Sequence, residues 1–153
     1  MSLGDRESFL KDEYILLQQL YENIDNRCLN IKGWGITLVS IVIAAGIKIS
    51  DTILFLGLVI SIVFWYIEAF WRSGHYFLGI RIEQIEKAFL DNDFKSKTPF
   101  QIYSTWNITY KNDGSKAMEY FFRPSTYLPH LVMFLICLII FVALRVGLII
   151  LPA

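Results

Sequence analysis

The fold is decided by residues 31–72, which read IKGWGITLVSIVIAAGIKISDTILFLGLVISIVFWYIEAFWR. No charged residue lies between Gly33 and Ile47 or between Ile53 and Ile67. A helix rises 1.5 Å per residue, so about 20 residues cross the ~30 Å hydrocarbon core of a bilayer. The few residues between the two runs are too short to cross back. We therefore expect residues 33–72 to form an antiparallel hairpin of two membrane-spanning helices.

A third apolar run lies near the C-terminus. Leu131 to Leu144 is uncharged, and Pro129 is expected in the first turn of a helix covering residues 127–153, where its missing N–H does least harm. The chain has 153 residues, of which 55% are hydrophobic, and its mean hydropathy is +0.48. These values favour a membrane protein. The fold class that we expect is an all-α membrane protein with three transmembrane helices.

Two heptad patterns flank the hairpin. In residues 1–32, apolar and aromatic side chains alternate at spacings of 4 and 3, and the pattern repeats after the second span. The two sets are Leu10, Tyr14, Leu17, Tyr21, Ile24, Cys28 and Ile31, and then Trp71, His75, Leu78, Ile82, Ile85 and Phe89. Such spacing predicts paired helices without naming the partner. We expect the two patterns to pack together as a cytosolic stalk, and a partner from another subunit remains the alternative.

Residues 73–126 are expected to hold the extension of the second span and a small cytosolic cap. Asp91-Asn92-Asp93 should end the extension. Thr98 is the expected N-cap of a short helix, with Pro99 in its first turn and Gln101 completing a capping box. The composition of residues 102–110 also suits a strand. We favour a helix because no second strand is available to pair with it.

A stripe of small and weakly polar residues follows one face of the first span. Its members are Gly33, Thr37, Ser40, Ala44 and Lys48. Such a face either packs closely against another helix or lines the water-filled lumen of an oligomeric pore. Arg145, near the far end of the third span, either reaches toward the interface or contributes to an outer pore mouth. Glu68 is expected to be a paired carboxylate, with Arg72 four residues on, or else an ion-coordinating one.

Basic and aromatic residues alternate in the cap. Lysines and an arginine beside aromatic rings suit stacked bases and phosphates, or the rings pack on the stalk and the cations face solvent. The candidate ligand-binding residues are Lys95, Lys97, Tyr103, Trp106, Lys111, Lys116 and Arg123.

The chain carries no recognisable catalytic motif. It has no phosphate loop, no HExxH sequence and no nucleophile elbow, and its two cysteines lack metal-ligand spacing. His75 and His130 have no evident carboxylate partner in the sequence. We therefore expect no enzyme, no cofactor, no catalytic residue and no metal site.

The distribution of basic residues predicts the orientation. Lys and Arg are frequent before residue 33 and between residues 72 and 126, whereas Lys48 and Arg145 stand alone at the other ends of the spans. Because cytoplasmic loops are richer in Lys and Arg, we expect a cytosolic N-terminus and a periplasmic C-terminus in a bacterial inner membrane.

The sequence of residues 10–90 resembles those of small membrane proteins of bacterial anti-phage loci. It is most similar to the HalA family of Hailong-system membrane effectors and less similar to two-span SLATT effectors, from which the third span departs. The stretches that carry the resemblance are Asp12-Glu13-Tyr14, Gln19-Leu20-Tyr21-Glu22, Asp25, Arg27, Ile31-Lys32-Gly33-Trp34 and Glu68-Ala69-Phe70-Trp71-Arg72.

The resemblance implies a function that the periodicity does not. It implies a homo-oligomeric ion channel in contact with membrane lipid, with a tetramer as the candidate assembly. The channel would be controlled by a nucleotide or single-stranded DNA oligomer made by a nucleotidyltransferase-like partner. The alternative is a non-conducting membrane scaffold that docks a soluble partner through residues 92–126.

Overall fold

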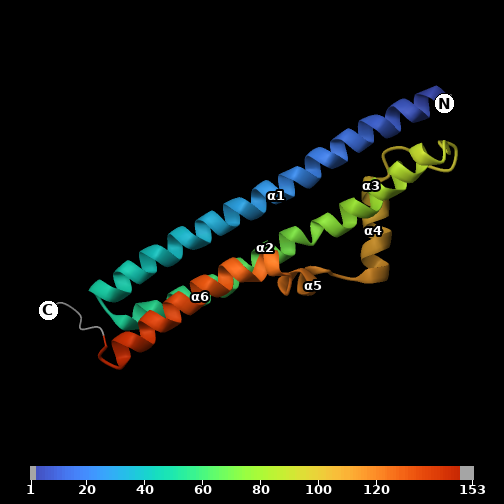
Figure 1. Cartoon of the computed structure of the whole chain (residues 1–153). Coiled ribbons are helices and arrows are strands. Elements are labelled where there is room, and N and C mark those ends of the chain that lie inside the picture. The colour runs from blue at the N-terminus through green and yellow to red at the C-terminus, as the bar shows by residue number, and fades with distance from the viewer. Residues whose placement is uncertain (1–2, 149–153) are drawn as a thin grey trace. The chain divides into compact units, whose positions relative to one another are not determined.

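The computed structural model describes residues 3–148, and all regular secondary structure in that range is helical (Figure 1). The helices are α1 (Leu3–Lys48), the short 3-10 helix η1 (Asp51–Ile53), α2 (Leu54–Arg72), α3 (Gly74–Leu90), α4 (Ile102–Asp113), α5 (Ala117–Phe121) and α6 (Pro124–Arg145). The predicted all-α class is confirmed.

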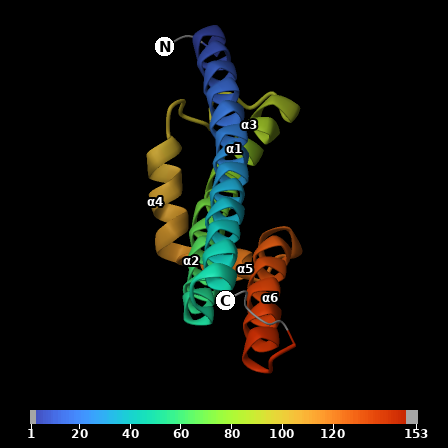
Figure 2. The same ribbon diagram turned by 90° about the vertical axis from the view of Figure 1, so that its left-hand side faces the viewer.

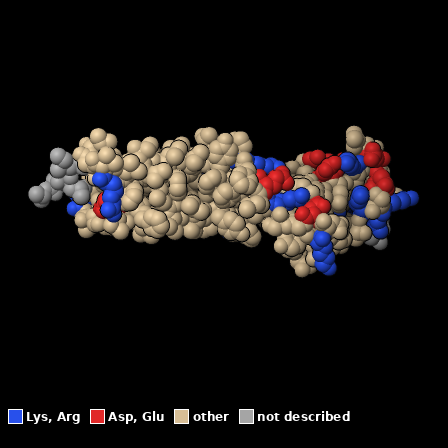
Figure 3. Space-filling view, turned by 90° about the horizontal axis from the view of Figure 1, so that it is seen from below, with Lys and Arg blue, Asp and Glu red and all other residues tan. Residues whose placement is uncertain are grey.

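Among the described residues, three helical stretches are long and apolar enough to cross a membrane. They are Leu3–Lys48, Asp51–Leu90 and Pro124–Arg145. Figure 3 shows a broad tan surface that carries no charged residues except for a small group at one end. The short connection through η1 joins α1 directly to α2, and the two helices form a hairpin (Figure 1). These three apolar helices indicate a membrane-embedded protein.

The chain divides into two compact units. What we call the polar unit contains residues 3–26 and 72–116, and the apolar unit contains residues 27–71 and 117–148. Helix α1 is a single unbroken helix that contributes to both units (Figure 2). Helix α2 ends at Arg72 and α3 begins at Gly74, so the second long helix is interrupted at Ser73.

The core of the polar unit is formed by the two heptad patterns. Leu10 and Leu17 of α1 pack with Ile82 and Ile85 of α3. The Tyr14 hydroxyl donates to Glu86 at 3.0 Å, and the ring of His75 lies 3.1 Å from the carbonyl oxygen of Tyr21. A residue later in α1 therefore contacts a residue earlier in α3, which shows that the two helices are antiparallel. The two patterns therefore contact each other within the chain.

Helix α4 packs on α3 and confirms the predicted helix over the strand alternative. The predicted cap is wrong, because α4 begins at Ile102 and its N-cap, Gln101, makes no side-chain capping bond. The reason lies in competing partners. The carbonyl oxygen of Thr98 accepts from Arg81 at 2.8 Å, and the Gln101 side chain accepts from the Ser104 hydroxyl at 2.8 Å.

Glycines allow the helices of the apolar unit to approach closely. A Cβ atom at Gly46 would lie 2.6 Å from the Leu54 side chain, and one at Gly57 would lie 2.8 Å from the Cys137 sulfur. Both positions have no room for a larger residue. Small residues therefore do set the helix packing, as expected in a membrane, but they are not the residues of the predicted stripe.

Helix α6 begins three residues before the predicted third span. Pro124 occupies its first turn, so Pro129 lies inside the helix and not in the first turn. At one end of α6, His130 contacts Glu68 of α2, and at the other end Arg145 contacts Asp51 of η1. Helix α6 therefore runs antiparallel to α2 within the apolar unit.

Candidate functional site

A buried cluster of ionisable side chains joins α1, α2 and α6 in the apolar unit. Glu68 of α2 is fully buried. One carboxylate oxygen lies 3.1 Å from Nζ of Lys32 on α1, and the other lies 2.8 Å from Nε2 of His130 on α6. His130 is fully buried and the Lys32 side chain is 18% exposed. A carboxylate in an apolar environment requires such partners, because an uncompensated charge there is costly.

A proline completes the cluster. Pro129 has no N–H, so it cannot donate to the carbonyl four residues earlier in α6, which is that of Ser125. Nζ of Lys32 donates to this Ser125 oxygen at 3.1 Å. One ammonium group therefore neutralises Glu68 and also supplies the hydrogen bond that Pro129 removes.

Two polar atoms at the cluster are buried without a hydrogen-bond partner among residues 3–148. They are Nδ1 of His130 and the hydroxyl oxygen of Thr126. Both residues are fully buried. They lie four residues apart on α6, so their side chains are on the same face of the helix. Most buried polar atoms in proteins are hydrogen-bonded, and an unsatisfied pair marks a place where a proton or a water can act.

The sequence analysis did not find this cluster. It singled out Glu68, but the expectation that His130 lacks a carboxylate partner is wrong. The sequence did give a signal in the expected depth of these residues in the membrane. Lys32 precedes the first span, Glu68 lies near the end of the second and His130 lies near the start of the third. In a three-span topology those positions fall at the same membrane level. The sequence does not tell whether they face one another.

The predicted pore-lining stripe faces outward from the apolar unit. Gly33, Thr37, Ser40, Ala44 and Lys48 are all exposed. The neighbouring face of α1 is the one that packs within the chain, and its buried residues are Gly35, Val39, Val42 and Gly46. The Thr37 hydroxyl donates back to the Gly33 carbonyl oxygen at 2.9 Å. Close packing within the chain therefore does not explain the stripe.

Arg145 is held at the hairpin turn. Its Nε lies 2.5 Å from a carboxylate oxygen of Asp51, and its side chain remains 58% exposed. The guanidinium also lies over the ring of Phe141, 5.4 Å from its centroid. The arginine therefore ties the end of α6 to the turn between α1 and α2.

The candidate ligand-binding residues divide between the two units. Tyr103, Trp106 and Tyr110 form a stack along α4, with ring centroids 5.8 and 5.3 Å apart. Phe77 of α3 packs against Trp106 and Tyr110. The aromatic residues therefore partly pack on α3, as one interpretation expected, while Tyr103 remains 74% exposed.

The cations are placed differently. Nζ of Lys116 lies 4.8 Å from the ring centroid of Tyr76, and Lys111 is exposed directly after Tyr110. Lys95 and Lys97 lie in the segment before α4, where the Lys95 carbonyl accepts from Arg6 at 3.0 Å. Arg123 belongs to the apolar unit and pairs with Glu119 at 2.6 Å. The structure thus groups the rings with Lys111 and Lys116 in the polar unit.

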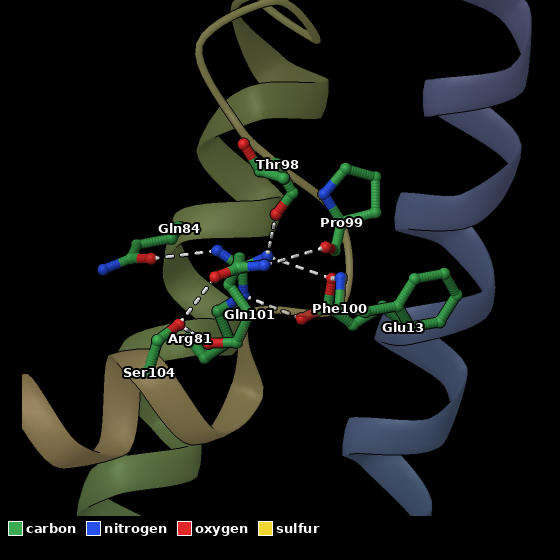
Figure 4. A network of polar contacts seen from close by, with 8 residues as sticks. All are labelled: Glu13, Arg81, Gln84, Thr98, Pro99, Phe100, Gln101 and Ser104. Atoms are coloured by element: carbon green, nitrogen blue, oxygen red, sulfur yellow. Dashed lines mark hydrogen bonds and ion pairs between the residues drawn. The ribbon is translucent and has the colours of Figure 1, made fainter. Parts of the chain in front are cut away.

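A second buried ion pair, also missed in the sequence, fixes the segment that leads into α4 (Figure 4). Nε and Nη2 of Arg81 donate to the two carboxylate oxygens of Glu13 at 2.8 and 3.0 Å. The amide of Phe100 donates to Glu13 at 2.7 Å, and the backbone there has a positive φ of 59°. Arginine forms such two-pronged bonds because its donors match the two carboxylate oxygens. The pair therefore holds α1, α3 and the Thr98–Phe100 backbone together.

Neither a metal site nor a known relative identifies the chain. Within residues 3–148 no group of three or more His, Cys, Asp or Glu side chains is placed to hold a metal ion. The chain matches no family model, no curated protein and no solved structure.

Proposed function

We propose that this protein is a homo-oligomeric membrane effector of bacterial anti-phage defence that acts as a ligand-gated ion channel. The observation that carries the proposal is the exposed stripe on α1, with Thr37, Ser40 and Lys48 turned away from the chain's own packing face. The anti-phage role comes from the resemblance of residues 10–90 to Hailong-system effectors.

Lipid chains are a poor environment for the polar members of the stripe. A lysine at the end of a span can reach the interface, but a hydroxyl-bearing stripe gains little from contact with lipid chains. A second copy would cover its small residues, and a ring of copies would turn Ser40 and Lys48 toward a shared lumen. A groove of about 370 Å³ lined by Trp34, Thr37, Leu38 and Phe64 lies beside the stripe and offers a recess for a neighbouring side chain.

The proposed gate lies in the polar unit. The stack of Tyr103, Trp106 and Tyr110, with Lys111 and Lys116 nearby, offers aromatic faces and positive charge to a nucleotide or a single-stranded DNA oligomer. In this proposal the polar unit is a cytosolic stalk and cap, the membrane is the bacterial inner membrane and the C-terminus is periplasmic, in keeping with the distribution of Lys and Arg.

Ion flux from liposomes that contain the purified full chain tests the channel. We expect a basal or ligand-dependent flux that Ser40→Leu abolishes, because leucine would fill a narrow lumen and remove the hydroxyl. The matched control is Ile41→Leu, since Ile41 is the next residue and is 60% exposed. Equal flux in the wild type and Ser40→Leu, with equal insertion, would remove the stripe as the pore lining.

A second candidate function is a non-conducting scaffold. It is favoured by the exposure of Tyr103 and Ile108 on α4, which are 74% and 60% exposed and could contact a soluble partner. Liposomes that never leak, with or without short oligonucleotides or nucleotides, would favour this scaffold. A leak that follows addition of the ligand would favour the channel.

A further inference from the structure

The Lys32–Glu68–His130 cluster has a chemical capacity that a simple ion pair lacks. An ionised carboxylate can only accept hydrogen bonds, so Nε2 of His130, 2.8 Å from Glu68, carries the hydrogen in the neutral ring. The remaining nitrogen, Nδ1, then has a free lone pair, and it is buried with no partner. The cluster therefore holds one vacant proton-accepting atom inside the apolar unit.

The same helix also carries a group that can accept a hydrogen bond from that added proton. The hydroxyl oxygen of Thr126 is buried, has no partner and lies one helical turn before His130. A hydroxyl can accept from Nδ1–H as readily as it can donate to a bare Nδ1. A rotation of Thr126, or one water between the two atoms, would satisfy either state of the ring.

We infer that the Lys32–Glu68–His130 cluster is a proton-binding site in which uptake of a proton at Nδ1 of His130 releases Lys32 from Glu68. Charged groups that the apolar unit brings to His130 include Glu68 of α2 and, across that carboxylate, Lys32 of α1. Protonation adds a further cation beside the buried Glu68 carboxylate. Like charges repel strongly where water is scarce, so a cation that can reach water is displaced.

Lys32 is the cation that can leave. Its side chain is 18% exposed, whereas His130 has no exposed surface, and a lysine can extend its ammonium group into water. When Lys32 leaves, the Ser125 carbonyl also loses its donor, since Pro129 provides none. Proton binding would thus exchange a link between α1 and α6 for a stronger link between α2 and α6. This switch does not depend on ion conduction.

The first test observes the proton directly. The chain has only two histidines, so ¹⁵N-histidine NMR of the full chain in lipid nanodiscs gives two rings, and His75→Gln identifies the other one. Spectra are recorded at pH 8 and after acidification, and we expect the neutral Nε2–H tautomer in the first and a second ring proton at Nδ1 in the second. A ring that stays neutral while the protein remains folded, or that is the Nδ1–H tautomer at pH 8, would overturn the inference.

The second test observes the exchange of partners. Spin labels replace Leu29 of α1 and Leu128 of α6, which are 62% and 55% exposed, in samples diluted with unlabelled chain. Acid should create a second distance population whose weight follows His130 protonation. His130→Gln should abolish that response, and Lys32→Met should show the acid population at pH 8. A wild-type distribution that is the same at both pH values, despite protonation, would show that the cluster is only a structural clamp.

Discussion

Replacing Glu13 with glutamine isolates the contribution of the buried ion pair in the polar unit. Glu13 has no exposed surface, and the Arg81 side chain is 4% exposed. Glu13→Gln keeps the size of the side chain but leaves the guanidinium buried without a countercharge. Breaking a buried pair by removing one partner costs about 3–5 kcal/mol.

The same chain offers a control with identical chemistry at the surface. Glu83 pairs with Lys87 on α3, and their side chains are 60% and 64% exposed. Exposed helix pairs of this spacing contribute about 0.3–0.5 kcal/mol. Glu83→Gln should therefore cost about one-tenth as much as Glu13→Gln.

Hydrogen exchange of the full chain in detergent micelles is the appropriate assay, because it reports local opening. The Phe100 amide donates to Glu13 at 2.7 Å and is the direct reporter. A loss of about 3 kcal/mol corresponds to an exchange rate raised roughly 100-fold in the Thr98–Phe100 segment. Glu83→Gln should leave that segment within about twofold of wild type.

One result would refute the reasoning about this ion pair. If Glu13→Gln leaves exchange at Phe100 unchanged, the segment is held by other contacts, such as the aromatic contact of Phe100 with Phe9 at 5.9 Å. Phe9→Ala would then become the variant that accelerates exchange, and the pair would contribute little to the position of α4.

Two further predictions concern packing and titration. Gly57→Ala should lower the stability of the full chain in detergent by about 1–3 kcal/mol in a thermal or denaturant assay, because the new Cβ would meet the Cys137 sulfur at 2.8 Å. Gly79→Ala in α3, where the new Cβ would meet nothing within 4 Å, is the control and should not lower the stability. Hydrogen bonds from Ser96 hold the pKa of Asp93 below its ordinary value of 3.8, so Ser96→Ala should raise that pKa in a ¹³C carboxyl titration. The contribution of Asp93 to stability is present above the ordinary value and is lost as the pH falls through the lowered pKa, and an unchanged titration in Ser96→Ala would show that the hydroxyl has no part in it.

The sequence was sufficient for the features that depend on period and length. The uncharged runs before and after η1 predicted the hairpin, and the heptad spacing predicted that Leu17 and Ile85 would meet between antiparallel helices. Both signals repeat over many residues, so single exceptions do not obscure them. The prediction of where α4 starts was wrong for the opposite reason. It depended on one capping motif, which competed with a single tertiary hydrogen bond from Arg81 to the Thr98 carbonyl.

The buried pairs could not be predicted because each depends on rotational phase between helices. Glu13 lies beside the heptad position Tyr14, and Arg81 lies beside Ile82, so both are on the edges of their patterns. Residues at such edges are exposed or buried according to what a third segment does. Here the Thr98–Phe100 segment covers them. The orientation was predicted by counting Lys and Arg residues, Arg81 among them. Such a count does not distinguish a solvated cation from a buried one.

The course of α1 explains why the stripe was difficult to interpret. Its inward face continues from Ile31 through Gly35, Val39, Val42 and Gly46, at helical spacings of 3 and 4. The pattern is the same heptad-like face that starts at Leu10, but its side chains become small where α2 approaches. Exposed Ser40 and Ala44 lie on another side of the same helix, so two faces carry small residues for different reasons. Gly46 has no room for a Cβ atom beside Leu54, whereas Gly33 has nothing within 4 Å. One small-residue face is thus already occupied by the chain itself, and the other is the surface that a second copy would cover in the proposed oligomer.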